Sequence, residues 1–462
     1  MRVLSADLWE PAPGQVVTWD VTPGAGHVPE PAVPTYNQRN HLLGARGGEP
    51  SVWIAAAFDV AGPVDRAALE GAFRDLVAAH PGLRVEAVRR PDPEAVGLVR
   101  HDADALAWRP HEGPVTRTAD ETRAHLVAEL SRRCAPFGYP AFLPAAISRA
   151  DRSTVVLGLD HLHTDAWSTT VIVDELAARY AERADGARVA VRPARLLPAD
   201  PAALPSVGAD DPRLATWHGF LRERDWALPT FPLPLGVPHG ERAPQRTVVR
   251  TLADAATAGA VAARARSAGA STSAAVLVTL ARAMADLGGP ATLETLLPVH
   301  TRADDAARRS VGWHTTTVPL RIDSGTGHPS ARAWAAPAGD AQRTVPDTAL
   351  AETGKALRAA RELAAVPLEQ VVGTLPQPLR FPRRDIFQVS YLDYRRLPGH
   401  AAAAVSRAHH VSAATRADDL QVWVSRTDDG LAVRARMPRT ATATQVVDAL
   451  LDRWATILAD LG

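Results

Sequence analysis

The sequence predicts an α/β protein of two lobes joined by a proline-rich segment. The chain has 462 residues, more than one hydrophobic core usually organises. Short apolar runs alternate with amphipathic helical segments in both halves. Between these halves, residues 193–244 contain ten prolines, too many for a helix or a central strand. We therefore expect an N-terminal lobe over 1–192, a linker over 193–244 and a C-terminal lobe over 245–462.

The first half contains two strand–helix units. The apolar run VWIAAAFDV, residues 52–60, has the length of a strand that is buried on both faces. Asp65 can cap the helix that follows, whose apolar residues recur with helical spacing. The second unit has a strand over 153–159 and then a helix, for which Ser168 is the expected N-cap.

The second half continues the alternation beyond the linker. One short helix is expected inside the linker, at about 214–224. The other expected strands are at about 246–252, 292–298, 316–322, 387–393 and 420–425, and the helices are at about 253–267, 273–287, 353–364 and from 443 onward.

Composition excludes several classes of function. Lys+Arg and Asp+Glu both number 51, so no net field draws the protein to nucleic acid or to an anionic membrane. Cys134 is the single cysteine, which excludes an internal disulfide and a metal site of several thiolates. The start, MRVLSADLWEPAPGQ, has no signal-peptide pattern, and no apolar run is long enough for a membrane span. We expect a cytoplasmic protein that binds its ligands in a shaped pocket.

The segment LGLDHLHTDAWSTT, residues 157–170, concentrates the candidate chemistry. A strand that ends in a histidine, followed by a turn and a capped helix, places the imidazole at the carboxyl edge of a sheet, where open α/β sheets bind ligands. If the strand continues, His161 and His163 share one face and Asp160 lies on the other. Asp160 is then not placed to orient His161 as the aspartate of a triad would.

Three interpretations of this segment remain open on the residues alone. The first is a histidine that only satisfies the end of a strand. The second takes His163 and Asp165 as part of a non-haem iron site, with a distal histidine such as His300 as the third ligand. The third is a general base, His161, with Asp165 holding the loop through a buried partner.

The segment HLHTDAWS resembles the HHxxxDGxS signature of the condensation domains of nonribosomal peptide synthetases and of the chloramphenicol-acetyltransferase-like superfamily. Further blocks of the chain resemble the same domains in the same order, across Thr35 to Ala435. They are PTYNQRNHL (34–42), AGPVDRAALEGAFRDLVAAHPGLRV (61–85), a block that ends in LLPVHTR (296–302), SVGWHTTTVPLRI (310–322) and DDLQVWVSRTDDGLAVRA (418–435).

The resemblance implies two chloramphenicol-acetyltransferase-like lobes arranged as a V, with a tunnel between them and the histidine at its midpoint. It implies a stand-alone condensation enzyme that forms an amide or ester in secondary-metabolite biosynthesis. The acyl or aminoacyl thioester would arrive on the phosphopantetheine arm of an acyl or peptidyl carrier protein, and a small nucleophile or a second carrier protein would supply the acceptor. No cofactor or metal of its own is implied.

The resemblance also assigns roles to individual residues. His161 matches the second histidine of the motif, which acts as base or positions the nucleophile. Asp165 matches the motif aspartate, which binds an arginine from the other lobe, here Arg302. We therefore expect Asp165 to be structural and His161 to affect the rate. Trp167 is expected to pack, and Ser168 to cap the helix or line the tunnel.

Two positions depart from the motif. Asp160 replaces the first histidine, and a carboxylate on the covered face of a sheet must find a cation or take up a proton. Ala166 replaces the glycine, and it enters positive-φ conformations less readily.

These departures resemble the signature of heterocyclization domains, which condense Cys, Ser or Thr and then cyclodehydrate. Thr315 and Asp393 stand where the threonine and aspartate that matter for cyclisation would be. Plain condensation ranks first, because His161 is retained. Heterocyclization and an inactive carrier-protein-binding scaffold are the alternatives.

Overall fold

The computed structural model describes residues 1–92, 95–186, 206–325 and 345–462. They divide into two compact units. The first contains the described residues up to 186 together with Arg302–Thr315 and Arg396–Ala414, and the second contains the remainder. The sequence-based boundaries place both of these segments in the C-terminal lobe, whereas they pack with the first unit here. Side chains of one such segment complete the candidate site.

The first unit is built on a seven-stranded sheet with the order β1-β14-β4-β9-β8-β2-β7, and a three-stranded sheet with the order β3-β6-β5 accompanies it. Its strands are β1 (Arg2–Ser5), β2 (Gln15–Pro23), β3 (Glu30–Ala32), β4 (Trp53–Ala61), β5 (Val85–Arg89), β6 (Val96–Arg100), β7 (Leu106–Val115), β8 (Phe142–Ser148), β9 (Arg152–Asp160) and β14 (His409–Ser412). Its helices are α1 (Tyr36–Arg46), α2 (Arg66–Ala79), α3 (Ala119–Arg133), α4 (Ala166–Ala184), α8 (Asp305–Arg308) and α11 (His400–Val405).

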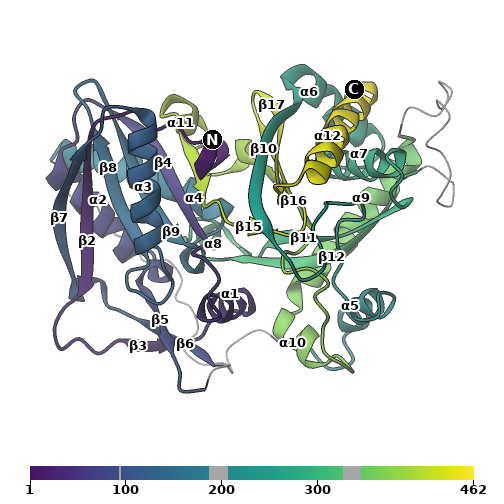
Figure 1. Cartoon of the computed structure of the whole chain (residues 1–462), viewed down its shortest axis with the longest axis horizontal. Helices are drawn as coiled ribbons and strands as arrows, with labels where there is room; N and C mark the ends of the chain where they lie inside the picture. Colours follow the sequence, from purple (N-terminus) through teal and green to yellow (C-terminus); the bar gives the residue numbers. More distant parts are fainter. Residues whose placement is uncertain (93–94, 187–205, 326–344) are drawn as a thin grey trace. The chain divides into compact units, whose positions relative to one another are not determined.

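Strand β4 confirms the expectation of a strand buried on both faces. Trp53, Ala55 and Ala57 pack with residues of α3, whereas Ala56 and Phe58 pack on the opposite face with residues of α2 and α4. Figure 1 shows α3 on one side of this sheet and α2 on the other. This strand is antiparallel to both of its neighbours, β9 and β14. Helices on both faces bury these strands just as they would bury parallel ones.

The two helices that cover one face of this sheet, α2 and α4, begin at aspartates. Asp65 caps α2 as expected, since its side chain accepts a hydrogen bond from the backbone N–H of Ala68 at 3.0 Å. The cap of α4 is Asp165 and not Ser168. Ser168 lies three residues further on, and its backbone N–H donates to Asp165. The prediction of Ser168 as cap was wrong because Asp165 has the same capping chemistry one turn earlier.

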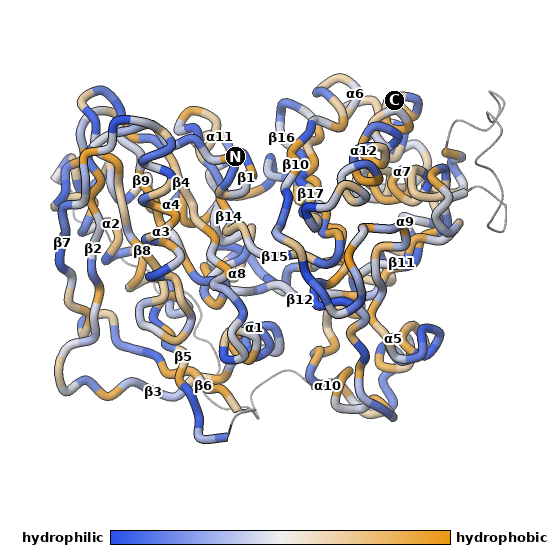
Figure 2. The backbone as a smooth tube through the Cα atoms, in the orientation of Figure 1, coloured by the Kyte–Doolittle hydropathy of each residue, from blue (hydrophilic) through white to orange (hydrophobic). Residues whose placement is uncertain are grey.

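The second unit has its own seven-stranded sheet, with the order β12-β11-β13-β16-β17-β10-β15. Its strands are β10 (Ala243–Asp254), β11 (Thr292–His300), β12 (Thr315–Asp323), β13 (Gln388–Asp393), β15 (Arg416–Ala417), β16 (Gln421–Thr427) and β17 (Gly430–Pro438), and its helices are α5 (Pro212–Arg222), α6 (Ala255–Ser267), α7 (Thr272–Asp286), α9 (Asp347–Glu362), α10 (Leu368–Gly373) and α12 (Ala441–Leu461). Figure 2 shows hydrophobic stretches along α7 and α12. Both helices contribute to a single core with the strands, and Trp454 of α12 is fully buried in it.

The predicted linker over 193–244 starts outside the described residues. From 206 onward it belongs to the second unit. Helix α5 lies where a short helix was expected, and it buries Leu214, Trp217 and Leu221 in the core of that unit. The prolines therefore mark an irregular stretch that is packed against a core over its described part.

No single helix among the described residues is both long enough and apolar enough to span a bilayer. One bent pair, α6 with α7, passes the same test when the two are taken together, by length and composition alone.

A glycine in β9 generates a stability prediction. A Cβ at Gly158 would lie 1.9 Å from Cδ2 of Leu130 and 3.5 Å from Sγ of Cys134, both fully buried on α3 or at its end. Gly158→Ala must displace a packed side chain, so we expect a loss of about 1–3 kcal/mol in the free energy of unfolding. Chemical denaturation measures this loss. Gly138→Ala is the control, since its Cβ would meet only a carbonyl oxygen at 3.8 Å; an equal effect of both variants would contradict the packing argument.

Candidate active site

The candidate site forms where β9 passes into α4. The strand stops at Asp160, a 3-10 turn covers His161–His163, and α4 begins at Ala166. Because the strand does not continue, the two histidines do not share a face as the alternation predicted. His161 is partly exposed, whereas His163 is fully buried and its Nδ1–H donates to the carbonyl oxygen of Gly82 at 2.8 Å. Only His161 is therefore open to a substrate.

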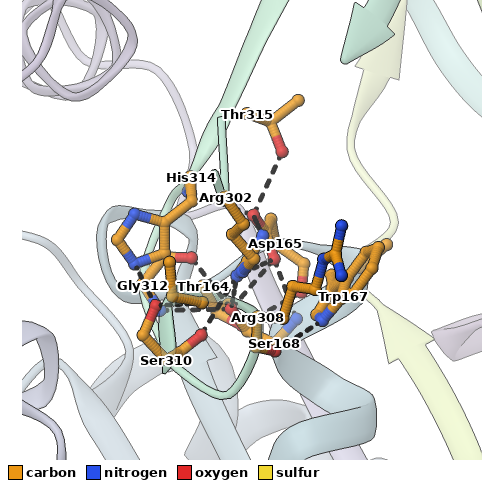
Figure 3. A network of polar contacts seen from close by, with 12 residues as sticks. Thr164, Asp165, Trp167, Ser168, Arg302, Arg308, Ser310, Gly312, His314 and Thr315 are labelled. Carbon is orange, nitrogen blue, oxygen red and sulfur yellow. Dashed lines mark hydrogen bonds and ion pairs between the residues drawn. The ribbon is translucent and has the colours of Figure 1, made fainter. Parts of the chain in front are cut away.

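Asp165 is the centre of a buried polar network (Figure 3). Its Oδ1 is contacted by the backbone N–H of Ser168 at 2.8 Å, the Ser168 hydroxyl at 2.9 Å and Nη2 of Arg302 at 3.0 Å. Its Oδ2 accepts from Nη1 of Arg302 at 2.8 Å, the backbone N–H of His314 at 3.0 Å and the Thr315 hydroxyl at 3.1 Å. Both oxygens are thus fully used inside the protein, and Asp165 is placed to hold structure.

Arg302 is the partner that the motif implied for Asp165. Its guanidinium binds both carboxylate oxygens, a bidentate geometry that is among the strongest ionic contacts in proteins. Nη2 also donates to the Ser168 hydroxyl at 2.8 Å and to the carbonyl oxygen of Ser310 at 3.2 Å. The resemblance placed this arginine on the other lobe. The structure instead places it in Arg302–Thr315, a segment that packs with the first unit.

Burial and charge have opposite effects on the pKa of Asp165. Burial alone raises the pKa, but the adjacent charge of Arg302 and the hydrogen bonds to the carboxylate outweigh it and hold the pKa well below its usual range. In the same segment, burial and then the charge of Arg302 lower the pKa of His314 to about 4. Asp165 is therefore charged and His314 neutral near pH 7, so neither changes its charge there.

His161 has a different environment. Its ring lies 3.9 Å from the ring of Trp313, centroid to centroid, with 36° between the planes. Nδ1 is buried and has no hydrogen-bond partner among the described residues, so Nε2 is the nitrogen available to a ligand. Burial, and next the neighbouring His41, lower the pKa of His161 below its ordinary value. A neutral imidazole with a free nitrogen is the form that accepts a proton.

Asp160 has a partner that the sequence analysis did not identify. Its carboxylate is fully buried, and Oδ1 lies 2.7 Å from Nε2 of His41 on α1 and accepts from the backbone N–H of Leu162 at 2.9 Å. The sequence predicted a cation or a proton for this carboxylate, and the partner that the structure shows is an imidazole. His41 belongs to the PTYNQRNHL block, but the 119 residues that separate it from Asp160 hide the pairing.

Of the remaining candidate residues, Trp167, Ser168 and Thr315 lie in the first unit near Arg302, and Asp393 lies in the second unit. Trp167 donates from Nε1 to the carbonyl oxygen of Arg308 at 2.8 Å, and its ring lies 5.6 Å from the guanidinium carbon of Arg302. Ser168 and Thr315 belong to the Asp165 network. Asp393 belongs to the second unit, where Nε and Nη2 of Arg395 donate to its two oxygens at 2.8 and 2.7 Å.

The iron interpretation conflicts with these contacts. Asp165 would have to give up Arg302 to ligate a metal, and Nδ1 of His163 is already bound to Gly82. His300 belongs to the second unit. Within the described ranges, no group of three His, Cys, Asp or Glu side chains is placed to hold a metal ion.

No protein-family model matches the sequence. Among curated proteins, the trehalose-2-sulfate acyltransferase PapA2 of Mycobacterium tuberculosis (strain H37Rv) is 27% identical over 357 residues, which cover 69% of this chain and 70% of the relative. PapA1 of M. tuberculosis (strain CDC 1551), a 2'-acyl-2-O-sulfo-trehalose (hydroxy)phthioceranyltransferase, is 26% identical over 351 residues, 68% of this chain and 63% of the relative.

Solved structures share the fold over nearly the whole chain. PapA2 acyl transferase matches with a TM-score of 0.83 at 22% identity, covering 100% of this chain and 99% of that one. The first condensation domain of the calcium-dependent antibiotic synthetase matches with a TM-score of 0.64 at 17% identity, covering 93% and 97%. The predicted condensation-domain fold is confirmed, and the relatives agree with the predicted class of enzyme, an acyltransferase.

The Asp165–Arg302 pair generates a stability prediction with a defined pH dependence. Arg302→Met leaves a buried carboxylate unpaired, which should cost about 3–5 kcal/mol in the free energy of unfolding at pH 7. Because the folded state lowers the pKa of Asp165, the pair stabilises fully above the unfolded value of about 3.9, and the stabilisation is lost as the pH falls below it. Urea unfolding at several pH values should show the difference between variant and wild type shrinking in acid.

The control for this prediction is Asp305→Asn, which breaks the exposed pair between Asp305 and Arg308 in the same segment. We expect almost no effect, since exposed pairs contribute little. A loss for Arg302→Met that is as small, or that does not change with pH, would contradict the assigned role.

Proposed function

We propose that this protein transfers an acyl group from a thioester to a hydroxyl or amine, with His161 as the base that assists the nucleophile. The observation that carries the proposal is the contrast within one motif. Asp165 is saturated by contacts inside the protein, whereas His161, four residues before it, has a free Nε2 and is partly exposed. A rigid carboxylate network thus presents an imidazole that has no structural contact through Nε2.

The lowered pKa of His161 suits this chemistry. At neutral pH the ring is uncharged, so Nε2 can take the proton of the acceptor as its oxygen or nitrogen attacks the thioester carbonyl carbon. A new C–O or C–N bond forms, the C–S bond breaks, and the thiolate leaves and takes the proton back from the imidazolium. Atoms and charge balance without a metal or redox cofactor.

Likeness to condensation domains supports the expected donor, a thioester on the phosphopantetheine arm of a carrier protein. The protein would then act as a stand-alone enzyme that needs no cofactor of its own. Likeness to PapA2, which is named for acylating trehalose-2-sulfate, favours a hydroxyl acceptor and therefore an ester product. We also propose a role in secondary-metabolite biosynthesis and a carrier protein as the partner.

The contacts of Thr315 and Asp393 weigh against the heterocyclization alternative. The Thr315 hydroxyl donates to Asp165, and Asp393 accepts two hydrogen bonds from Arg395. Both side chains therefore have structural partners. No observation supports the inactive-scaffold alternative, because it explains neither the free Nε2 of His161 nor the lowered pKa of that ring.

Removal of the His161 imidazole tests the proposal. We expect His161→Ala to lower kcat/KM by about a hundred- to ten-thousandfold, the contribution of a general base, with the thermal transition unchanged. The assay follows the intact mass of acyl-carrier protein and of acceptor, with hydroxyl and amine acceptors in parallel. His125→Ala is the matched control, because His125 is also partly exposed in the first unit but lies outside the site. Equal turnover of wild type and His161→Ala would refute the role, and binding of carrier protein without turnover would favour a scaffold.

The mass of the product separates condensation from heterocyclization. With serine or cysteine acceptors, we expect the product to keep the mass of the simple condensate, and Asp393→Ala to leave both the rate and the mass unchanged. A wild-type product lighter by one water, together with the loss of that species in Asp393→Ala, would establish heterocyclization instead.

A further inference from the structure

A second imidazole lies beside His161 and has no role in the mechanism above. His41 of α1 lies 6.4 Å from His161, centroid to centroid, and its ring meets Trp313 edge-on at 5.9 Å. We propose that the Asp160–His41 pair binds the acceptor, and that it selects acceptors with a second hydroxyl or amine donor on the atom next to the nucleophile. This inference rests on the proposed acyl transfer.

The pairing with Asp160 fixes which nitrogen of His41 is left for a ligand. Nε2 of His41 lies 2.7 Å from Oδ1 of Asp160, a carboxylate oxygen that also accepts from the Leu162 N–H. A carboxylate oxygen accepts, so Nε2 donates the proton. Nδ1 is then the remaining nitrogen, since the bond to Asp160 is the only hydrogen bond that the His41 ring makes among the described residues. In the neutral ring, Nδ1 carries a lone pair that can accept an O–H or N–H of a ligand.

Helix α1 does not need His41 in order to dock. The helix starts with a reciprocal cap between Thr35 and Gln38. Gln38 also donates from Nε2 to the carbonyl oxygen of Leu162 at 2.9 Å, and Leu42 packs against Leu162 in a small apolar cluster. Gln38, His41 and Leu42 lie on one helix face, at i, i+3 and i+4. Two of the three already attach α1 to the turn, so a polar, partly exposed histidine between them adds little that packing requires.

The spacing of the two rings suits a ligand with two donors. An oxygen or nitrogen bonded to a ring nitrogen lies about 4 Å from the ring centroid, given hydrogen bonds of about 2.9 Å. Two centroids 6.4 Å apart can therefore each accept from donors on neighbouring atoms of one small molecule. Since Nε2 of His161 and Nδ1 of His41 both act as acceptors, a single O–H satisfies only one of them. A vicinal diol or an amino alcohol satisfies both.

Burial is the largest cause of the lowered pKa of His161, so this ring is neutral and can accept a proton. His161 is therefore the proton acceptor, while His41, held by Asp160, binds the neighbouring donor. This accounts for Asp160 at the position where the motif has its first histidine: the carboxylate orients an imidazole that comes from α1 instead.

Matched acceptors test the inference. Wild type, His41→Ala and Asp160→Asn receive a decanoyl-pantetheine thioester with cis-1,2-cyclohexanediol or cyclohexanol, and in a second arm with 2-aminocyclohexanol or cyclohexylamine. We expect wild type to prefer the two-donor member by about tenfold in kcat/KM, the upper end of what one additional hydrogen bond contributes. In His41→Ala the ratio should fall to about 2 for the diol, the statistical factor for two equivalent hydroxyls, and in Asp160→Asn it should fall part of the way.

Several controls keep the outcomes distinct. His101→Gln breaks a similar pair, between His101 and Glu86 at 2.8 Å in the same unit, and should leave the ratio unchanged. His161→Ala should lower turnover of both acceptors. A wild type without a preference, or a His41→Ala variant that keeps it, would overturn the inference while leaving acyl transfer intact.

If wild type acylates none of these probes, the failure belongs to the proposed function, and binding then decides the inference. Imidazole ¹⁵N spectra of histidine-labelled protein should show His41 with Nε2 protonated and Nδ1 bare, and the diol should shift the His41 resonances more than cyclohexanol does. Protonated Nδ1, or equal shifts from both alcohols, would refute the assignment.

Discussion

The site depends on one buried ion pair. Asp165 caps α4 with one oxygen and meets Arg302 with both, so the same carboxylate fixes the start of a helix and fastens a distant stretch of chain to it. Arg302 is 137 residues from Asp165 in sequence, and the segment it begins also carries His314 and Thr315 into contact with that carboxylate. Trp313, which lies against His161, belongs to the same short segment, so its place beside the imidazole follows from the ion pair.

Two residues of the motif have separate roles. The Asp165 carboxylate holds the structure, and the His161 imidazole is left accessible for chemistry. Every polar contact that Asp165 makes lowers the freedom of the turn, which carries His161 at its first residue. His163 contributes to the same rigidity, because its ring is buried and bound to the backbone. The contacts of Asp165 and His163 thus fix the position of His161, while Nε2 of His161 takes part in none of these contacts. Preorganisation of this kind is what separates a reactive histidine from one that merely ends a strand.

The sequence predicted those parts of the molecule whose signal is local. Asp65 before an amphipathic helix, the apolar run around Phe58 and the strand that leads to Asp160 all depend on neighbouring residues, and each was placed within a few positions. The pairing of Asp165 with Arg302 came from a motif resemblance and not from spacing. Where a contact was both distant and outside the motif, as for His41 with Asp160, nothing in the sequence ties one residue to the other. The cap of α4 shows a different limit, since Asp165 and Ser168 carry the same capping signal.

The order of the strands in the first sheet has a consequence for the synthesis of the protein. Strand β14 lies between β1 and β4, yet its residues, His409–Ser412, come more than two hundred positions after the last helix of the N-terminal stretch. At ribosomal rates of about 5–20 residues per second, the nascent N-terminal strands wait on the order of ten seconds or more for that neighbour. During this interval β4 presents an open edge, and the buried carboxylate of Asp165 waits for its guanidinium in the same way. The first unit is therefore completed only late in translation, and a polypeptide truncated near the sequence-based boundary would lack the strand that joins β1 to β4.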